Sequence, residues 1–322
     1  MAISKEEVLW CYRMILGREP ESEDIVNIHM QNKNITILRE VFFNCKEFTG
    51  KRLELSAKQP SPFVPLGTLK NEIEYTASSS QLARCVVKIK EAWSHLGATQ
   101  PHFSVLTDTQ FLPENLDKNL DKFWASGETE AVEIEKMLVR HNFDSLSTKT
   151  CVEFGCGVGR VTTGLARRFN QVDAYDISQG HLFHAEQHSK ELKLSNCRFN
   201  LCSDNILDPL KMCDFFYSKI VFQHNPPPVI YHLIRNALRA LNPGGIAIFQ
   251  VPTYIIGYHF SINEWITTDH KLDMQMHCLP QQVIFEIIMN ENCALLEVRE
   301  DNSTGALDRF VSNNFVVQRA IK

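Results

Sequence analysis

The chain has 322 residues, more than one ordinary domain needs, so we expect one large domain and a smaller companion. Hydrophobic residues make up 44% and charged residues 22%, which excludes a disordered chain, a collagen-like repeat and a bundle of membrane spans. The formal net charge of −5 argues against a nucleic-acid partner, because binding to its phosphate backbone rewards a basic excess.

The amino terminus, MAISKEEV, has no apolar signal core, and the ten cysteines are scattered without paired spacing. No apolar stretch reaches the roughly 20 residues that span a bilayer. We therefore expect reduced thiols, a cytoplasmic protein and no membrane segment.

Residues 1–50 predict a small helical domain. Ser4 and Glu7 fit a capping box, an apolar face then repeats at helical spacing, and Gly17 suits a helix end. The segment GREPESED indicates a turn followed by a new helix. A second helical stripe is expected from Ile35, Leu38, Val41, Phe42, Cys45 and Phe48.

Residues 51–80 are rich in proline and serine, which predicts a linker or strap between this domain and a main domain at 81–322. Helices are expected at 81–96 and 127–141.

From residue 148 onward, short apolar strands alternate with amphipathic helices. This pattern is typical of an α/β fold with a doubly wound, mostly parallel sheet and helices on both faces. Two late strands, ALLEVRED and NNFVVQRA, flank a turn near Gly305 and are expected to add an antiparallel edge.

The segment CVEFGCGVGR places three glycines between a predicted strand and a predicted helix. Gly155, Gly157 and Gly159 stand at the first crossover, where ligands meet bare backbone in such sheets, and glycine alone adopts positive φ cheaply. Glu153 adds a carboxylate that suits a cationic ligand better than a pyrophosphate. Asp176 ends the next strand, where an acid can accept hydrogen bonds from a ribose diol.

The run VEFGCGVGR followed by DAYDIS resembles the first two motifs of class I S-adenosylmethionine-dependent methyltransferases, over about residues 100–320. The resemblance implies a seven-stranded, Rossmann-like sheet whose last hairpin reverses one strand. It implies S-adenosyl-L-methionine as cofactor and S-adenosyl-L-homocysteine as product. Together with the acidic net charge, it leads us to expect methyl transfer to oxygen or nitrogen of a small-molecule or saccharide-like acceptor.

The resemblance also implies which residues contact the cofactor. Asp176 would hold the ribose, Asp204 and Asn205 would lie beside the adenine, and Gln223 would open toward the reaction centre. The expected contacts are Glu153, Gly155, Cys156, Gly157, Gly159, Arg160, Asp176, Ile177, Asp204, Asn205, Gln223 and Gly127, the last from a segment that also offers Phe123 and Ser126.

His224 is a candidate general base, since an imidazole titrates near neutrality, and equally a candidate structural histidine bonded to a carbonyl. The aromatic-rich segment at about 252–278 favours a lid over the acceptor or, alternatively, a local hydrophobic plug. Its candidate substrate contacts are Tyr254, Tyr258, Phe260, Trp265 and His277. The histidines match no tight ligand spacing, so we expect no metal site.

Two other functions stay open. An NAD-type Rossmann oxidoreductase is disfavoured because the glycine spacing is GxGxG, whereas GxGxxG seats a pyrophosphate. The second is a non-catalytic, cofactor-binding scaffold. Residues 5–48 resemble a small helical domain of unknown function that bacteria attach to glycan-modifying or methylating enzymes, which implies a bacterial protein. The sequence leaves open whether the chain forms a homodimer.

Overall fold

The computed structural model describes residues 3–48, 71–205, 207–269, 274–305 and 309–321. The chain divides into two compact units, Met1–Phe63 and Val64–Lys322. This division falls inside the predicted linker at 51–80. Residues 49–70 of that region lie outside the described residues, and Glu72–Ile73 form a short strand, β1.

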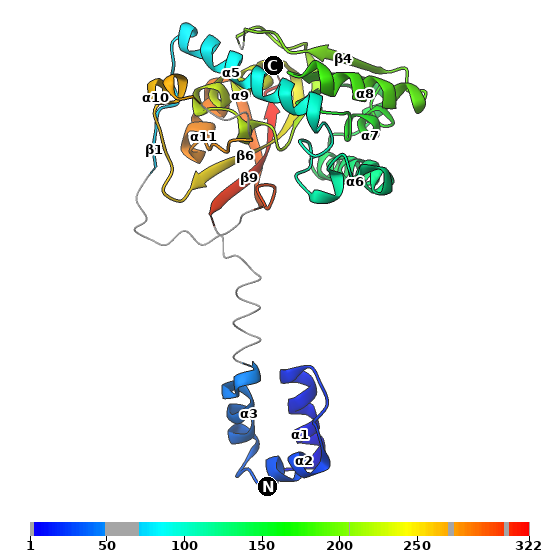
Figure 1. Ribbon diagram of the computed structural model, residues 1–322, viewed down its shortest axis with the longest axis vertical. Coiled ribbons are helices and arrows are strands. Elements are labelled where there is room, and N and C mark those ends of the chain that lie inside the picture. The colour runs from blue at the N-terminus through cyan, green and yellow to red at the C-terminus, as the bar shows by residue number, and fades with distance from the viewer. Residues whose placement is uncertain (1–2, 49–70, 206, 270–273, 306–308, 322) are drawn as a thin grey trace. The chain divides into compact units, whose positions relative to one another are not determined.

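Within residues 3–48 the amino-terminal unit contains the short helices α1 Lys5–Cys11, α2 Glu23–Met30 and α3 Ile35–Asn44 (Figure 1). The predicted capping box is present, since the Ser4 hydroxyl accepts from the Glu7 N–H and the Glu7 carboxylate accepts from the Ser4 N–H. A π-helical turn, η1 Tyr12–Leu16, extends α1 to Gly17, whose φ of 65° ends it.

The apolar stripe predicted for α3 is too broad. Leu38 and Phe42 are buried in the core of this unit, but Ile35 is 40% exposed and Val41 is 41% exposed. In the described residues α3 packs on α1 and η1 through one narrow face, so the flanking apolar side chains stay accessible.

A seven-stranded sheet lies at the centre of the second unit, in the order β4-β3-β2-β5-β6-β9-β8. The strands are β2 Thr150–Phe154, β3 Gln171–Asp176, β4 Cys197–Leu201, β5 Cys213–Ser218, β6 Leu241–Ile255, β8 Cys293–Asp301 and β9 Phe310–Arg319. The first five in spatial order run parallel, whereas β9 is antiparallel to β6 and to β8. The predicted Rossmann-like sheet with one reversed strand is confirmed.

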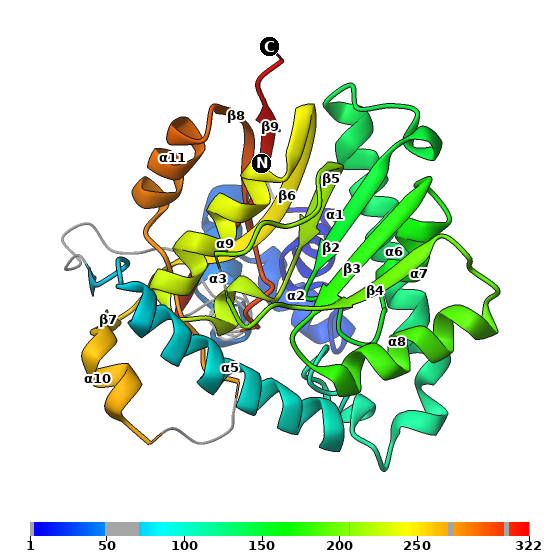
Figure 2. The ribbon, with the colours of Figure 1, turned by 90° about the horizontal axis from the view of Figure 1, so that it is seen from above.

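Helices cover both faces of the sheet (Figure 2). The helices α6 Leu120–Arg140 and α7 Thr162–Ala166 pack with Cys151, whereas α9 Pro227–Arg239 and α11 Gln281–Asn290 pack on the side of Val152. Adjacent residues of one strand point to opposite faces, so this pair separates the two cores.

Three more helices lie toward the sheet edge at which the site is found. They are α5 Ser79–Thr99, α8 Gln179–Glu191 and α10 Ile262–Thr267. The long helix α5 contacts α8, α9 and α10, and Figure 2 shows it lying across this edge. Beside it, β1 pairs in parallel with β7 His259–Phe260.

The helix predicted at 127–141 begins earlier, at Leu120. Gly127 lies inside α6 rather than at its start. A Cβ at this position would stand 1.9 Å from the Arg160 carbonyl oxygen, so only glycine fits there. The glycine therefore permits close packing of helix on loop, which a sequence pattern does not distinguish from a helix boundary.

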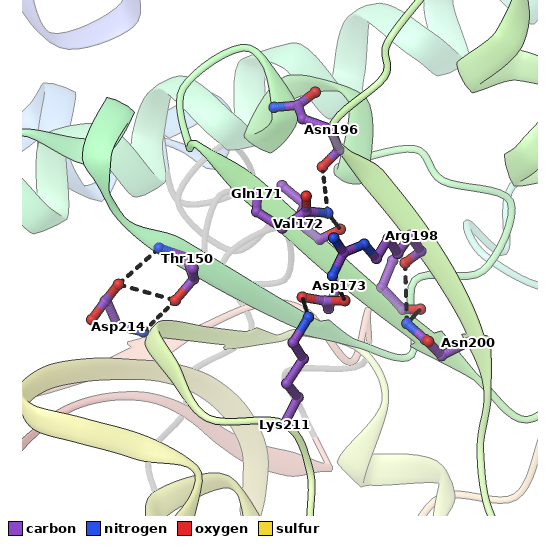
Figure 3. Close-up of polar contacts among 10 residues, drawn as sticks. Thr150, Gln171, Val172, Asp173, Asn196, Arg198, Asn200, Lys211 and Asp214 are labelled. Carbon is purple, nitrogen blue, oxygen red and sulfur yellow. Dashed lines mark hydrogen bonds and ion pairs between the residues drawn. The ribbon is translucent and has the colours of Figure 1, made fainter.

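Two aspartates in β3 have different surroundings. The buried Asp173 carboxylate receives Lys211 Nζ at 2.8 Å, and Arg198 stands 3.9 Å away, as Figure 3 shows. A similar contact joins the starts of β2 and β5, where the Thr150 N–H donates to Asp214 at 2.8 Å. The Asp173 carboxylate is therefore paired within the sheet, and Asp176 is the acid at the end of β3.

Among the helices in the described ranges, none is both long and apolar enough to cross a membrane.

Candidate functional site

A pocket opens where β2, β3, β4 and β5 end, beneath α5. Four strands and the segments after them line it. The lining residues include Glu153 to Gly157 after β2, Asp176 of β3, Asn205 after β4 and Lys219 to Val221 after β5. Helix α5 supplies Trp93. Ligands of doubly wound sheets bind at this edge, so the topology and the pocket agree.

Two glycines of the loop after β2 are required by both backbone and space. Gly155 has φ 75° and Gly157 has φ 55°, conformations that other residues adopt at a cost. A Cβ on Gly155 would lie 2.3 Å from Val221, and one on Gly157 would lie 2.4 Å from Val105. The loop thus lets main chain approach the pocket closely.

The buried carboxylate of Asp176 ties this loop to the start of α8. One oxygen accepts from the Gly157 N–H at 2.8 Å, and the other accepts from the Ser178 N–H at 2.9 Å. Each oxygen keeps a further lone pair, so the carboxylate can also accept from ligand hydroxyls.

Glu153 is a buried acid at the end of β2. Burial raises the pKa of its carboxyl to about 7, even though Thr162 donates a 2.6 Å hydrogen bond and Arg160 lies nearby. A carboxyl that titrates near neutrality responds strongly to charge brought into the pocket. A cationic ligand favours its ionised form.

Positive groups form another part of the wall. Arg160 is buried and donates to Ser126 at 3.3 Å, while its Nε has no hydrogen-bond partner among the described residues. Lys219 Nζ donates to Glu130 at 2.8 Å, and the Tyr217 hydroxyl donates to the same oxygen at 3.0 Å. Arg160 can therefore still bind an anionic group of a ligand.

The structure brings most of the predicted cofactor contacts to this pocket, namely Glu153, Gly155, Cys156, Gly157, Arg160, Asp176, Ile177 and Asn205. Gly127, Gly159, Asp204 and Gln223 do not line it. The Asp204 carboxylate is exposed and pairs with Lys90 of α5 at 2.6 Å, so the placement predicted beside a base is not supported. Gly159, with φ 84°, packs on Ala185 of α8.

His224 is half-buried and does not line the pocket. Its Nδ1 donates to the Gln275 carbonyl at 2.9 Å, and its Nε2 lies 3.1 Å from the Gln223 amide nitrogen. Burial lowers its pKa to about 4. Both ring nitrogens are engaged within the protein, so the geometry favours the structural histidine over the general base.

The predicted substrate contacts of segment 252–278 gather away from the pocket. The Tyr258 hydroxyl lies 2.7 Å from His277 Nδ1, and the Trp265 indole donates to Gln275 at 2.9 Å. The rings of Phe260 and Trp265 pack around His277. In the described part of this segment these side chains pack on one another, and Tyr254, in β6, does not line the pocket either.

Sequence reasoning missed several residues of the pocket. Ser104, His181, Tyr217 and Lys219 line it, and Glu130 lies just behind. None belongs to a motif with fixed spacing, so the sequence carried no signal for them. Where the structure describes the chain, no three His, Cys, Asp or Glu side chains are grouped to hold a metal ion.

Residues 151–245 match a family model described as a methyltransferase domain. This part of the chain is therefore similar to a methyltransferase domain. The matched segment runs from β2 into β6 and includes the glycine loop and Asp176, so the chain is an enzyme and the oxidoreductase alternative is set aside.

Solved structures similar to this chain include magnesium protoporphyrin IX methyltransferase from Synechocystis with bound SAH. It has a TM-score of 0.47 and 16% identity, over 62% of this chain and 87% of that chain. Another is geranyl diphosphate C-methyltransferase from Streptomyces coelicolor, with a TM-score of 0.45 and 14% identity, over 60% and 77%. No curated protein matches the chain.

Proposed function

We propose that the protein transfers a methyl group from S-adenosylmethionine, held in the pocket at the carboxyl ends of β2 to β5. The observation that carries the proposal is the buried Asp176 carboxylate, bonded to the Gly157 N–H at a crossover where positive φ and crowding both demand glycine. This arrangement lies inside the matched methyltransferase domain.

The pocket offers a partner for each part of this cofactor. Asp176 would accept from the ribose hydroxyls, and Asn205 and Ile177 would border the adenine. Arg160, with its unpartnered Nε, would hold the carboxylate, and Glu153 would favour the positive charge. When bound, the cofactor supplies an activated methyl group for displacement by a nucleophile. The protein aligns the two reactants and excludes water.

The acceptor in this proposal is oxygen or nitrogen of a small molecule or a saccharide-like compound. The net charge of −5 supports it, because a polyanionic acceptor would favour a basic protein. The resemblance of residues 5–48 to a helical domain of glycan-modifying bacterial enzymes supports a role of the amino-terminal unit with such an acceptor.

Isothermal titration calorimetry with S-adenosylmethionine, S-adenosylhomocysteine and NAD tests the cofactor assignment. We expect the first two to bind at one site per chain and NAD to give no heat of binding. Tight NAD binding with silence toward the other two would overturn the proposal. Transfer of labelled methyl groups to a panel of hydroxyl and amine acceptors would then identify the acceptor class.

The affinity for S-adenosylmethionine should rise with pH around neutrality. The bound cation favours ionised Glu153, whose pKa in the free protein is raised to about 7, so binding releases a proton below that pH. We expect the dissociation constant to fall between pH 6 and pH 8 and then to level off. The variant Glu153→Gln should flatten the profile, and an unchanged slope in that variant would assign it to another group.

A further inference from the structure

His181 lies in the first turn of α8 and is only 1% exposed. Its ring contacts two segments, one of them at Ser104, 77 residues before His181 in sequence. On one side, Nε2 lies 2.8 Å from the hydroxyl of Ser104, and on the other, Nδ1 lies 3.4 Å from Asp176. His181, Ser104 and Asp176 all line the pocket.

The proton positions at this ring follow from its neighbours. The Asp176 carboxylate can only accept, so a bare Nδ1 beside it would set two lone pairs against each other. The Ser104 hydroxyl can accept from Nε2 while donating to the Pro101 carbonyl at 3.0 Å, or it can donate to Nε2. When the Ser104 hydroxyl donates to Nε2, the single proton of a neutral ring lies on Nδ1 and points to Asp176, which avoids this repulsion.

This contact is not yet a complete hydrogen bond in the structure. At 3.4 Å it exceeds the usual range for nitrogen and oxygen, and Nδ1 has no hydrogen-bond partner among the described residues. The opposite Asp176 oxygen is held by the Gly157 N–H. The oxygen nearest Nδ1 accepts from the Ser178 N–H, and a small rotation of the carboxylate would bring it within hydrogen-bond distance of Nδ1 as well.

We propose that His181 is a positioning residue for cofactor binding, which orients the Asp176 carboxylate through Nδ1 and ties it to residues 101–106 through Ser104. This inference rests on the proposed function, since Asp176 is taken to hold the cofactor ribose. Val105 also lines the pocket, against Gly157. The packing of residues 101–106 against the glycine loop and the binding of the cofactor therefore depend on each other.

Two variants of His181 distinguish the contact made by Nδ1 from the contact made by Nε2. In His181→Asn the amide nitrogen takes the place of Nδ1 and keeps a donor beside Asp176, whereas in His181→Gln it takes the place of Nε2 and keeps a partner for Ser104. We expect His181→Gln to bind S-adenosylhomocysteine about 10-fold more weakly and His181→Asn to stay within about 3-fold of wild type. A purely structural histidine would make the two variants equally weak.

Calorimetry on the full chain measures these constants, with thermal unfolding as a check on folding. His184→Gln, on the same helix but outside the pocket lining, is the matched control and should bind as wild type. Wild-type affinity in His181→Gln, or equal losses in the Asn and Gln variants, would overturn the inference while leaving the proposed function intact. Failure of the wild type to bind would instead count against the proposed function.

A second measurement needs neither cofactor nor a folded Gln variant. Nitrogen NMR of histidine-labelled wild-type protein reports which ring nitrogen of His181 carries a proton, with the signal assigned by its loss in His181→Asn. We expect Nδ1 to be protonated at pH 7. A neutral ring with the proton on Nε2 alone would overturn the inference.

Discussion

Replacing Asp176 by asparagine is expected to weaken S-adenosylmethionine binding by about 100-fold. The carboxylate now accepts from two backbone N–H groups, those of Gly157 and Ser178. An asparagine must turn its NH₂ group toward one of these donors, and it also loses the charge that strengthens bonds to ribose hydroxyls. Calorimetry at constant pH measures the loss.

Asp173→Asn is the matched control, because Asp173 lies on the same strand, is also buried and stays outside the pocket. Its carboxylate pairs with Lys211, so we expect a loss of about 2 kcal/mol in the free energy of unfolding and an unchanged dissociation constant. If both variants lost affinity equally, Asp176 would act through the sheet and not through the ligand.

Gly157→Ala should be the second severe substitution, with about 30-fold weaker cofactor binding. The added Cβ would stand 2.4 Å from Val105, and the backbone φ of 55° disfavours alanine. Relief of the clash moves the segment around Val105 or the loop itself, and either movement disturbs the Gly157 N–H bond to Asp176. Binding titrations and denaturant unfolding report the two consequences separately.

Gly257→Ala is the control for the cost of a positive φ without a steric clash. Gly257 has φ 68°, and no atom lies within 4 Å of an added Cβ. It should lose about 1 kcal/mol of stability and no affinity. Adding Val105→Ala to Gly157→Ala should restore part of the binding, because it removes the contacting methyl. Wild-type affinity in the single Gly157→Ala variant would contradict the assigned role of this loop.

Much of the fold could be predicted because its signals are local. Alternating strands and helices, the Ser4–Glu7 capping box and the glycine loop depend on residues close in sequence, and the structure contains each of them. The strand-end position of Asp176 follows in the same way, since parallel strands end at one edge.

The chemistry of single side chains depended on partners that lie far away in sequence. Asp204 pairs with Lys90, 114 residues earlier, and the His224 ring donates to the carbonyl of Gln275, 51 residues later. Neither partner has a spacing that a motif could encode. For this reason the base role of His224 and the adenine contact of Asp204 could not be judged from sequence.

The sequence by itself determined the parallel sheet, the glycine crossover and the acid that follows it, because backbone conformation and strand alternation are properties of short segments. Only the tertiary structure decided which side chains share the pocket. Ser104 reaches His181, and Glu130 reaches Lys219, because helices α6 and α8 and the segment after α5 pack against one sheet edge. Burial and electrostatic coupling, such as the raised pKa of Glu153, arise from that packing.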